Sequence, residues 1–335
     1  MNRLSEFDVI EQFFAPLSSS YGLGLLDDVA LLPSISEFGY ERIITNDALI
    51  ADVHFFSGDS PVSVARKALA VNISDIISKG AEPEGFLMSL AVPRAFSQLW
   101  IEEFAKGLKQ AIDEWQCPLF GGDTVVTPQT MMISITAFGK IPKGKLPKRS
   151  DAHPEDCILV SGTIGDSFLG LNLIQSEKCD SNKPLWTFSL SRSERDYLKD
   201  RYYHPSPRSA LIPVIQDFAH ASMDISDGLV GDFLKIARAS NLGAKLDIGL
   251  DILSSAARSA IIADQGLFDA LIRGGDDYEV LFTVAQENLT SCMEKAKKLG
   301  VPLTHIGTMH RSDSPVEIRH NGHMLSLGKA SFMHF

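Results

Sequence analysis

The sequence predicts a mixed α+β protein organised in two domains. Short β-like runs alternate with longer stretches of helical period, which favours a mixed fold over a helix bundle or a β-sandwich. The chain has 335 residues, 44% of them hydrophobic, enough for two cores at roughly 150 residues per domain. The stretch Gly139–Pro154 is rich in Lys, Pro and Gly, as connections are. We therefore place the N-terminal domain at residues 1–145 and the C-terminal domain at residues 150–335.

The predicted strands are short apolar runs bounded by polar or turn-forming residues. They are Val29–Leu32, Arg42–Thr45, Phe86–Val92, Met131–Phe138, Cys157–Ser161, Ala244–Ile248 and Glu279–Val284. The clearest helix has one apolar stripe with a period of about 3.6 residues. The stripe consists of Leu99, Phe104, Leu108, Ala111, Ile112 and Trp115. A second helix begins at Pro61, because the missing proline N–H costs nothing in a first turn.

The charge balance excludes several classes of partner. The 31 Lys and Arg residues face 42 Asp and Glu residues, for a net charge of −11, and no basic cluster is present to bind nucleic acid or an anionic membrane. The mean hydropathy is +0.04, and the apolar runs are short. Because Glu6, Asp8 and Glu11 lie in the first dozen residues, we expect neither a signal peptide nor a membrane span, and a cytoplasmic protein.

Two familiar catalytic chemistries have no support in the sequence. The chain contains no Gly-x-Ser-x-Gly motif, so a serine hydrolase is not indicated. The cysteines lack a Cys-x-x-Cys spacing, which gives no support to a zinc knuckle or a redox dithiol. They are expected to be reduced core thiols: Cys117, Cys157, Cys179 and Cys292.

Aspartates stand directly after, or inside, apolar runs, where an unpaired charge is costly. The segments are Leu25–Asp28, Ile43–Asp47, Val71–Ile77, Phe120–Thr124 and Met223–Gly228. Taken singly, each is explained by a helix cap or a turn. Asp75 fits that explanation least, because it lies inside a helical run. If these side chains converge, their repulsion requires protonation or bound cations, and oxygen ligands alone favour Mg²⁺, Mn²⁺ or Ca²⁺ over zinc. Magnesium that shares its coordination with a phosphate ligand is the natural expectation.

Two glycine-containing loops are candidate phosphate cradles. Gly139–Leu146 has the Walker A spacing, but Leu146 stands where Ser or Thr should bind Mg²⁺, and Pro142 and Pro147 oppose a loop that runs into a helix. We interpret that match as coincidental. Ser161–Ser167 follows a predicted strand and precedes a helical stretch, which is compatible with a phosphate cradle or with an ordinary strand-to-helix turn.

Read in order, these segments resemble the thiamine-monophosphate kinase family of the aminoimidazole-ribonucleotide synthetase superfamily. The resemblance spans nearly the whole chain, and the order of its motifs is more specific than any one of them. The matching segments are Asp27–Asp28, Thr45–Asp47, His54–Phe55, Lys67–Asp75, Gly80–Pro83, Gly121–Thr124, Arg149–Ser150, Gly162–Ser167, Pro205–Arg208, Asp224–Leu229, Gly274–Glu279 and Phe332–Phe335.

The resemblance implies ATP-dependent phosphorylation of thiamine monophosphate to thiamine diphosphate by direct in-line transfer. It implies a synthetase-like pair of α+β domains, with an N-terminal sheet that forms a homodimer, and no catalytic protein nucleophile. Its ligands for several Mg²⁺ ions fall on Asp28, Thr45, Asn46, Asp47, Asp75, Asp123, Asp224 and Asp227. Its ATP contacts fall on Gly121, Gly122, Arg149 and Ser226, and its thiamine contacts on His54, Asp276 and Phe332.

Three positions depart from the pattern of the family. Leu26 replaces a glycine before the aspartate pair, Asn46 replaces a threonine, and Asp276 replaces a glutamate. The last change shortens the side chain by one methylene, so we expect the substrate contact to be lost or mediated by water. The metal ligands are otherwise intact.

Alternatives remain open at this point. The chain could be another ATP-using member of the superfamily, although a selenophosphate synthetase needs a reactive residue near its N-terminus and the first cysteine here is Cys117. A nucleotide or metal sensor and a purely structural homodimer are the other classes. His54 could be a surface histidine, Arg149 a linker charge and Phe332 a core aromatic. Lys67 and Lys79, on the predicted helix of Asp75, could be ordinary solvated charges and are given no role.

Overall fold

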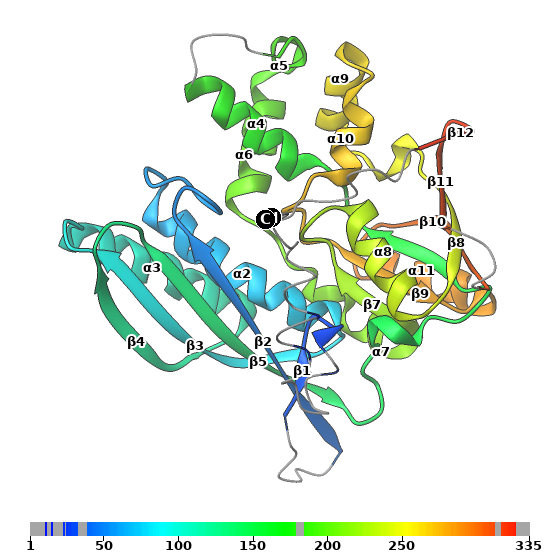
Figure 1. Cartoon of the computed structure of the whole chain (residues 1–335), viewed down its shortest axis with the longest axis horizontal. Coiled ribbons are helices and arrows are strands. Elements are labelled where there is room, and N and C mark those ends of the chain that lie inside the picture. The colour runs from blue at the N-terminus through cyan, green and yellow to red at the C-terminus, as the bar shows by residue number, and fades with distance from the viewer. Residues whose placement is uncertain are drawn as a thin grey trace, which may run out of the picture.

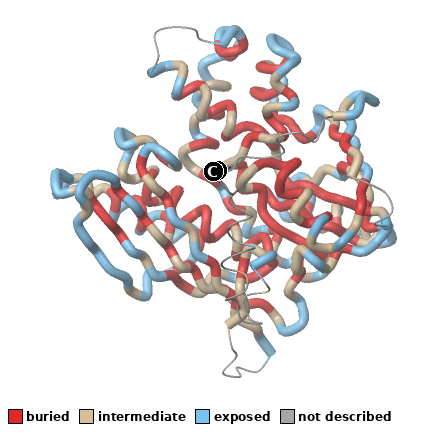
Figure 2. The backbone as a smooth tube through the Cα atoms, viewed as in Figure 1, coloured by how far each residue is buried: buried red, intermediate tan, exposed pale blue. Residues whose placement is uncertain are grey.

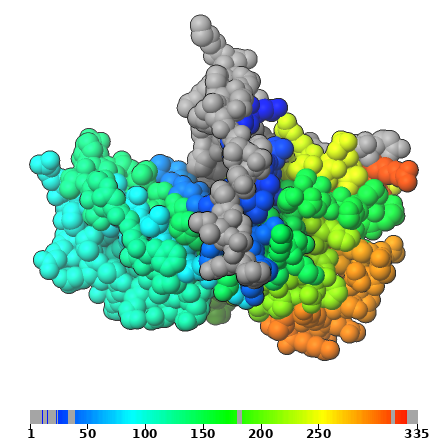
Figure 3. Space-filling model, turned by 90° about the horizontal axis from the view of Figure 1, so that it is seen from below, coloured from blue at the N-terminus to red at the C-terminus, as the bar shows by residue number. Residues whose placement is uncertain are grey.

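The computed structural model describes residues 25–32, 39–178, 184–311 and 316–325, together with residues 11, 15 and 23. Phe332 and Cys179 lie outside the described residues. Within those residues the chain forms two sheets, each with its own helices, which confirms the mixed α+β class (Figure 1). In the view of Figure 3 the cyan and blue-green residues lie on one side and the yellow-green to orange residues on the other. We call the two parts the N-terminal lobe (residues 25–142) and the C-terminal lobe (residues 149–325).

The N-terminal lobe contains a sheet of order β1-β2-β5-β3-β4 among the described residues. Its strands are β1 (Ala30–Leu31), β2 (Tyr40–Ile50), β3 (Glu82–Pro93), β4 (Leu119–Thr127) and β5 (Met132–Pro142). Only the β3–β4 pair among these is parallel. Helices α2 (Pro61–Ser78) and α3 (Gln98–Trp115) pack against each other beside the sheet (Figure 1).

The C-terminal lobe contains a sheet of order β12-β11-β8-β10-β6-β9-β7, again counted over the described residues. Its strands are β6 (Cys157–Ser161), β7 (Ala219–Asp224), β8 (Gly243–Asp247), β9 (Val280–Val284), β10 (Leu303–His310), β11 (Val316–His320) and β12 (His323–Met324). Its helices are α4 (Asp166–Lys178), α5 (Trp186–Ser189), α6 (Arg192–Tyr203), α7 (Ile212–Phe218), α8 (Leu229–Ala239), α9 (Ser255–Ala263), α10 (Leu267–Arg273) and α11 (Leu289–Lys298). Short 3-10 turns are η4 (Arg149–Asp151), η5 (Ser209–Leu211), η6 (Leu250–Ile252) and η7 (Gln286–Asn288).

Helix α2 is the element that joins the two lobes. It packs on β2 and β5 of its own sheet and also on β7 of the other lobe, so it is buried around most of its circumference (Figure 2). A helix in this position is largely apolar, and nine of the 14 residues from Val64 to Ile77 are Val, Ala, Leu or Ile. Polar residues that are buried among them, such as Lys67, Asn72 and Ser74, each require a partner.

The predicted elements agree with the structure at several points. The strand Cys157–Ser161 has the predicted bounds, α2 begins at Pro61, and the stripe of α3 is buried at Phe104, Leu108, Ala111 and Trp115. Leu99 is an exception, since it is 65% exposed. None of the described helices meets the length and hydropathy needed to span a bilayer.

The expected connection begins later than the sequence indicated, because β5 continues to Pro142. A Cβ on Gly139 would lie 2.6 Å from Cγ2 of Ile76, so this glycine serves the packing of α2 on the strand rather than a flexible loop. Residues 139–142 of the Walker-like match lie in this strand and not in a loop, which confirms that the match is coincidental.

Candidate active site

A cavity of about 820 Å³ opens between the lobes and collects most of the predicted site residues. It is lined from β2 and α2 on one side and from the loops after β7 and before β9 on the other. The predicted residues in its wall are Asp28, Thr45, Asn46, Asp47, His54, Asp75, Asp224, Ser226, Asp227 and Asp276. Segments separated by about 250 positions in the sequence therefore meet at one place.

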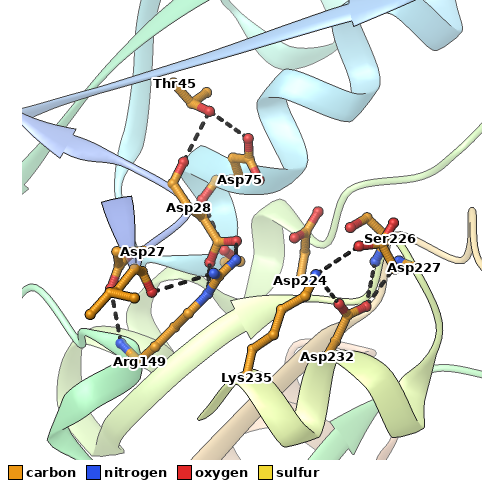
Figure 4. A network of polar contacts seen from close by, with 12 residues as sticks. Asp27, Asp28, Thr45, Asp75, Arg149, Asp224, Ser226, Asp227, Asp232 and Lys235 are labelled. Carbon is orange, nitrogen blue, oxygen red and sulfur yellow. Dashed lines mark hydrogen bonds and ion pairs between the residues drawn. The ribbon is translucent and has the colours of Figure 1, made fainter. Parts of the chain in front are cut away.

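Three carboxylates form the centre of this wall. One oxygen each from Asp28, Asp75 and Asp224 lie within 4.8 Å of one another. Asp28 comes from the loop before β1, Asp75 from α2 and Asp224 from the end of β7, as Figure 4 shows. Asp224 is 2% exposed, so these charges meet where water can screen them little.

Neighbouring hydroxyl groups hold the carboxylates in place. Thr45 Oγ1 donates to Oδ2 of Asp75 at 2.5 Å and lies 3.1 Å from the carbonyl oxygen of Asp28. Ser74 Oγ donates to Oδ2 of Asp224 at 2.6 Å. Adjacent residues of α2 thus contribute one carboxylate and orient a second one from the other lobe. The position of Asp75 inside the helix, which neither capping nor turn chemistry explains, is accounted for by this contact with β2.

The clustering changes the acidity of the carboxyl groups. Burial, together with the charge of Asp227, raises the pKa of Asp47 to about 6. Burial raises the pKa of Asp224 to about 7, with Asp232 and Asp47 adding to the effect. Burial and the same kind of repulsion, from Asp224 and Asp47, raise the pKa of Asp75 well above its usual range. Such a site favours either protons or cations among its oxygens.

Two basic residues offset negative charge at the edge of the carboxylate cluster. Lys79 is fully buried, and its Nζ lies 2.8 Å from Asp27 and 3.1 Å from Asp28. Arg149 donates through Nε to Asp28 at 3.2 Å, and its backbone N–H donates to Asp27 at 2.9 Å. Burial alone would raise the pKa of Asp27, but Lys79 and Arg149 lower it below its usual value. The interpretation of Lys79 as a solvated charge was wrong, since α2 is buried on both faces.

Asp232 organises the loop after β7 and was not singled out from the sequence. Its Oδ2 accepts the backbone N–H groups of Ser226 and Asp227 at 3.0 Å each, and that of Gly228 at 3.2 Å. Lys235 bridges Asp232 and Asp227 at 2.8 and 2.7 Å. This buried carboxylate therefore fixes the backbone that carries Ser226 and Asp227 into the cavity (Figure 4).

Asp276 lies beside Ser226, in the loop before β9, and its backbone N–H donates to the carbonyl oxygen of Ser226 at 2.8 Å. Its carboxylate accepts from Lys67 Nζ at 2.8 Å and from the Tyr278 hydroxyl at 3.2 Å. Lys67 is 3% exposed and also lies over the ring of Tyr202, 3.9 Å from its centroid. The interpretation of Lys67 as a solvated charge was therefore also wrong. Asp276 has a φ of +70°, a conformation that is costly for a residue with a Cβ and is often kept at functional sites.

Comparison with known proteins identifies the family of this arrangement. Residues 26–141 match the domain family "AIR synthase related protein, N-terminal domain", and residues 153–318 match its C-terminal counterpart. Curated thiamine-monophosphate kinases of Escherichia coli K12 and Bacillus subtilis are 35% and 32% identical to the chain. These alignments cover 98% and 99% of this chain, and 98% and 100% of the relatives. The chain belongs to the thiamine-monophosphate kinase family.

Solved structures of this kinase family share the fold. The structure of AaThiL complexed with AMPPCP and TMP superposes with a TM-score of 0.81 at 28% identity, covering 100% of this chain and 99% of that one. The thiamine-monophosphate kinase from Stenotrophomonas maltophilia K279a superposes with a TM-score of 0.74 at 32% identity, covering 95% and 97%. The first of these is a complex with an ATP analogue.

Some residues expected from the kinase family lie outside the cavity. Gly121, Gly122 and Asp123 are on β4, and the register of the sheet aligns Gly122 with Asp47 across two intervening strands, a separation of about 14 Å. The Gly-Gly pair forms no turn, since both residues lie in β4 and pair with β3. A Cβ on Gly122 would lie 1.8 Å from the carbonyl oxygen of Met88 on β3. The glycine is required for the close approach of these two parallel strands.

Asn46 contributes to the cavity wall, but its amide group points elsewhere. Successive strand residues face opposite sides of a sheet, and the Asn46 amide nitrogen donates to Ser134 Oγ at 3.1 Å and to Thr136 Oγ1 at 2.9 Å. It therefore does not join the Asp28, Asp75 and Asp224 oxygens in this structure. His54 lines the cavity, and its Nδ1 accepts the backbone N–H of Ile50 at 3.0 Å. Phe332 lies outside the described residues.

The loop Ser161–Ser167 is a strand-to-helix turn. The backbone N–H of Gly165 donates to Asp277 Oδ2 at 2.8 Å, so the carboxylate of a buried residue already lies at the start of α4. A carboxylate in this position satisfies the helix terminus as a phosphate would. The turn interpretation is the one that the structure supports.

Proposed function

We propose that the cavity between the lobes is where this chain transfers the γ-phosphoryl group of ATP to thiamine monophosphate, giving ADP and thiamine diphosphate. The activity is that of its family, a phosphotransferase with a phosphate group as acceptor, in the biosynthesis of thiamine diphosphate. The observation that carries the location is the convergence of Asp28, Asp75 and Asp224 within 4.8 Å. We also place the protein in the cytoplasm, where ATP is available and thiols such as the buried Cys117 stay reduced.

The donor set fits magnesium. It offers carboxylate oxygens from Asp28, Asp75 and Asp224, with Asp47 and Asp227 on the same wall, and hard oxygen ligands are those that Mg²⁺ prefers. The raised pKa values of Asp47 and Asp224 show how unfavourable the bare cluster is. We propose that several Mg²⁺ ions bind here. When bound, they supply positive charge to the phosphate groups of both reactants.

Charge neutralisation is what this reaction requires most. Two dianionic groups about 4 Å apart at an effective dielectric constant near 20 repel each other by roughly 16 kcal/mol. The acceptor phosphate is largely ionised at neutral pH, because its second pKa is about 6, so no general base is needed. An array of carboxylates that binds cations meets this requirement without a catalytic histidine or cysteine.

The transfer is proposed to be direct and in line, without a phosphoenzyme. No cysteine is among the described residues of the cavity wall. Burial raises the pKa of both Cys117 and Cys292 to about 12, which makes them poor nucleophiles. A kinetically competent protein-bound phosphate, recovered after rapid quenching with γ-labelled ATP, would reject this step.

Each substrate is assigned its own set of side chains. We propose that Ser226 in the wall and Arg149 beside Asp28 contact ATP, and that His54 and Asp276 contact thiamine monophosphate, with Phe332 as a further contact from outside the described residues. Apolar side chains in the wall offer a surface for the thiamine rings; they include Leu49, Val53, Phe168 and Leu171. Lys67 holds Asp276 toward this surface.

The glycine pair and Asp123 are proposed to reach the site from a second copy of the chain. Strand β4 is exposed along most of its length (Figure 2). Exposed apolar side chains lie on β3, β4 and β5: Leu87, Leu119, Phe120, Val125, Val126 and Met132. By the register of the sheet, Leu87, Val125 and Met132 share the face that α2 and α3 do not cover. A large exposed apolar face is typical of an interface, and a symmetric dimer through this sheet would supply Gly121, Gly122 and Asp123 to the cavity of its partner.

The activity test mixes purified protein, ATP, Mg²⁺ and thiamine monophosphate and measures thiamine diphosphate. We expect product only when all components are present, and none when unphosphorylated thiamine replaces the acceptor. ATP binding without product formation would instead favour a sensor.

Mixing two inactive variants tests the shared site. If Asp75 and Asp123 act across the dimer, a mixed dimer of the Asp75→Asn and Asp123→Asn chains has one intact site. Random exchange should then restore about a quarter of wild-type activity. If both residues serve the same chain, mixing restores nothing.

A further inference from the structure

A second cluster of metal-binding side chains lies in the C-terminal lobe, away from the cavity. His153 precedes β6, Asp156 immediately precedes the same strand, and His220 is on β7. One ligand atom from each lies within 4.8 Å of the others. His220 is four residues before Asp224 on the strand, which places it about 13 Å from the carboxylate cluster. None of the three residues lines the cavity.

The contacts converge on one point. Nδ1 of His153 lies 3.1 Å from Nδ1 of His220, which in turn lies 2.9 Å from Oδ1 and 3.0 Å from Oδ2 of Asp156. Asp156 is 2% exposed, and its Oδ2 also accepts the His153 backbone N–H at 2.8 Å and the Thr283 hydroxyl at 3.1 Å. These bonds fix the carboxylate and leave His220 as the contact of Oδ1.

Hydrogen bonding alone satisfies this arrangement poorly. A ring nitrogen has one in-plane direction, occupied by either a hydrogen or a lone pair. A single hydrogen on His220 Nδ1 cannot point both at Asp156 and at His153 Nδ1. A cation placed among the three atoms accepts all three lone pairs at once. Tetrahedral zinc with bonds of 2.0–2.1 Å has ligand atoms about 3.3 Å apart, close to the 3.1 and 2.9 Å separations here.

We propose that His153 Nδ1, His220 Nδ1 and Oδ1 of Asp156 bind one transition-metal ion of the zinc class. Two imidazoles and a carboxylate are ligands for zinc and similar ions rather than for magnesium, so this site and the carboxylate cluster select different metals. The ion clamps the segment after η4 onto the C-terminal sheet. That segment follows Arg149, whose carbonyl oxygen accepts separately from Ser240 Oγ at 2.7 Å, so Arg149 keeps this contact without the metal.

The test uses cobalt as a spectroscopic probe on the full chain. Protein stripped with a chelator is placed in excess Mg²⁺, which fills the carboxylate cluster, and is titrated with Co²⁺. We expect one equivalent to bind with the visible absorption of imidazole-bound cobalt, and this signal to be lost in His153→Gln and in His220→Gln. The matched control is His305→Gln, an exposed histidine on β10, which should keep the signal. Equal binding in all four proteins, or no binding in the wild type, would overturn the proposal.

Two further measurements complete the test. Zinc should raise the melting temperature of the wild type and not that of the His153→Gln/His220→Gln double variant, while Mg²⁺-dependent formation of thiamine diphosphate stays unchanged in that variant. If the double variant fails to fold, X-ray absorption spectroscopy of the zinc-loaded wild type still identifies the ligands of the metal. Two imidazoles and one carboxylate in the first shell support the site, and an all-oxygen shell contradicts it.

Discussion

The ammonium group of Lys67 lies 2.8 Å from the carboxylate of Asp276 and joins α2 of the N-terminal lobe to the loop before β9 of the C-terminal lobe. Both groups belong to the wall of the cavity. Asp276 is one methylene shorter than the glutamate usual in the family. Its ion pair with the buried Lys67 fixes the direction of its carboxylate. The pair is a structural reason to expect that Asp276 retains a role in substrate binding.

Replacing this lysine should affect one substrate more than the other. In Lys67→Met, Asp276 loses its charged partner, and a hydrogen bond to a charged group contributes about 1.5–3 kcal/mol. We expect KM for thiamine monophosphate to rise about 10-fold or more, with a smaller change in KM for ATP. Steady-state kinetics against each substrate measure this. Lys199→Met, which removes a more exposed pair with Glu177, is the control. Equal changes in both KM values would contradict the assignment of Asp276 to the thiamine end.

The buried Lys79 should be needed for stability. Lys79→Met removes the fully buried ammonium group that pairs with Asp27 and Asp28. Breaking a buried ion pair costs about 3–5 kcal/mol. Lys109→Met removes an exposed pair with Asp113 and should cost about 0.5 kcal/mol or less. Urea unfolding of both variants in the absence of Mg²⁺ measures the difference. Similar losses in the two would show that Lys79 does not balance the carboxylates.

The carboxylate cluster should make stability depend on pH and on magnesium together. The folded pKa values of Asp47 and Asp224, about 6 and about 7, exceed the unfolded value of about 3.9. Between these values the folded state holds more protons, so the free energy of unfolding falls as pH rises from about 4 to 7. Magnesium replaces those protons. We therefore expect Mg²⁺ to raise the melting temperature more at pH 8 than at pH 5.

The Asp47→Asn variant provides the control for the pH series. It removes one of the carboxyl groups whose pKa is raised by burial, so its stability without magnesium should fall less between pH 5 and pH 8. A fall as steep as that of the wild type would assign the pH dependence to other groups.

The exposed sheet face should govern the association state. Val125 on β4 is 47% exposed, and the register places it on the same face as Leu87 and Met132, so a lysine there would place a charge in the proposed interface. We expect Val125→Lys to sediment as a monomer at concentrations where the wild type is a dimer. Leu99→Lys places the same charge at a position on α3 that is 65% exposed and should remain dimeric. A wild-type chain that is monomeric throughout would reject the dimer and, with it, the shared site.

The sequence predicted the carboxylates of the site better than the residues that hold them in place. Asp75 could be predicted because a charged residue inside an apolar helical run requires a partner, and the structure provides Thr45. Lys79 could not, because a single sequence does not show that both faces of α2 are covered. Asp232 lies four residues after Gly228 in a run that also fits an ordinary helix start, and its three backbone contacts become visible only when the loop is folded.

The fold was predictable in class but not in several of its strands. A glycine pair in a sequence favours a turn, yet Gly121 and Gly122 lie within a strand, where the close approach of β3 requires a glycine at position 122. Strands β7 and β10 were not predicted, since Ala219–Asp224 and Leu303–His310 contain polar residues. Those polar positions are satisfied by specific partners, as Ser222 is by the carbonyl oxygen of Ser78.

The central claim is that carboxylates from distant segments gather to bind magnesium for phosphoryl transfer, and the Asp75→Asn variant tests it most directly. The change keeps the volume of the side chain and removes one charge from the cluster. We predict that thiamine diphosphate formation falls about 100-fold or more, with an unchanged circular dichroism spectrum and a higher Mg²⁺ requirement. The matched Asp113→Asn variant, on the exposed face of α3, should keep full activity. Turnover by Asp75→Asn at the wild-type rate and the wild-type magnesium concentration would contradict the account.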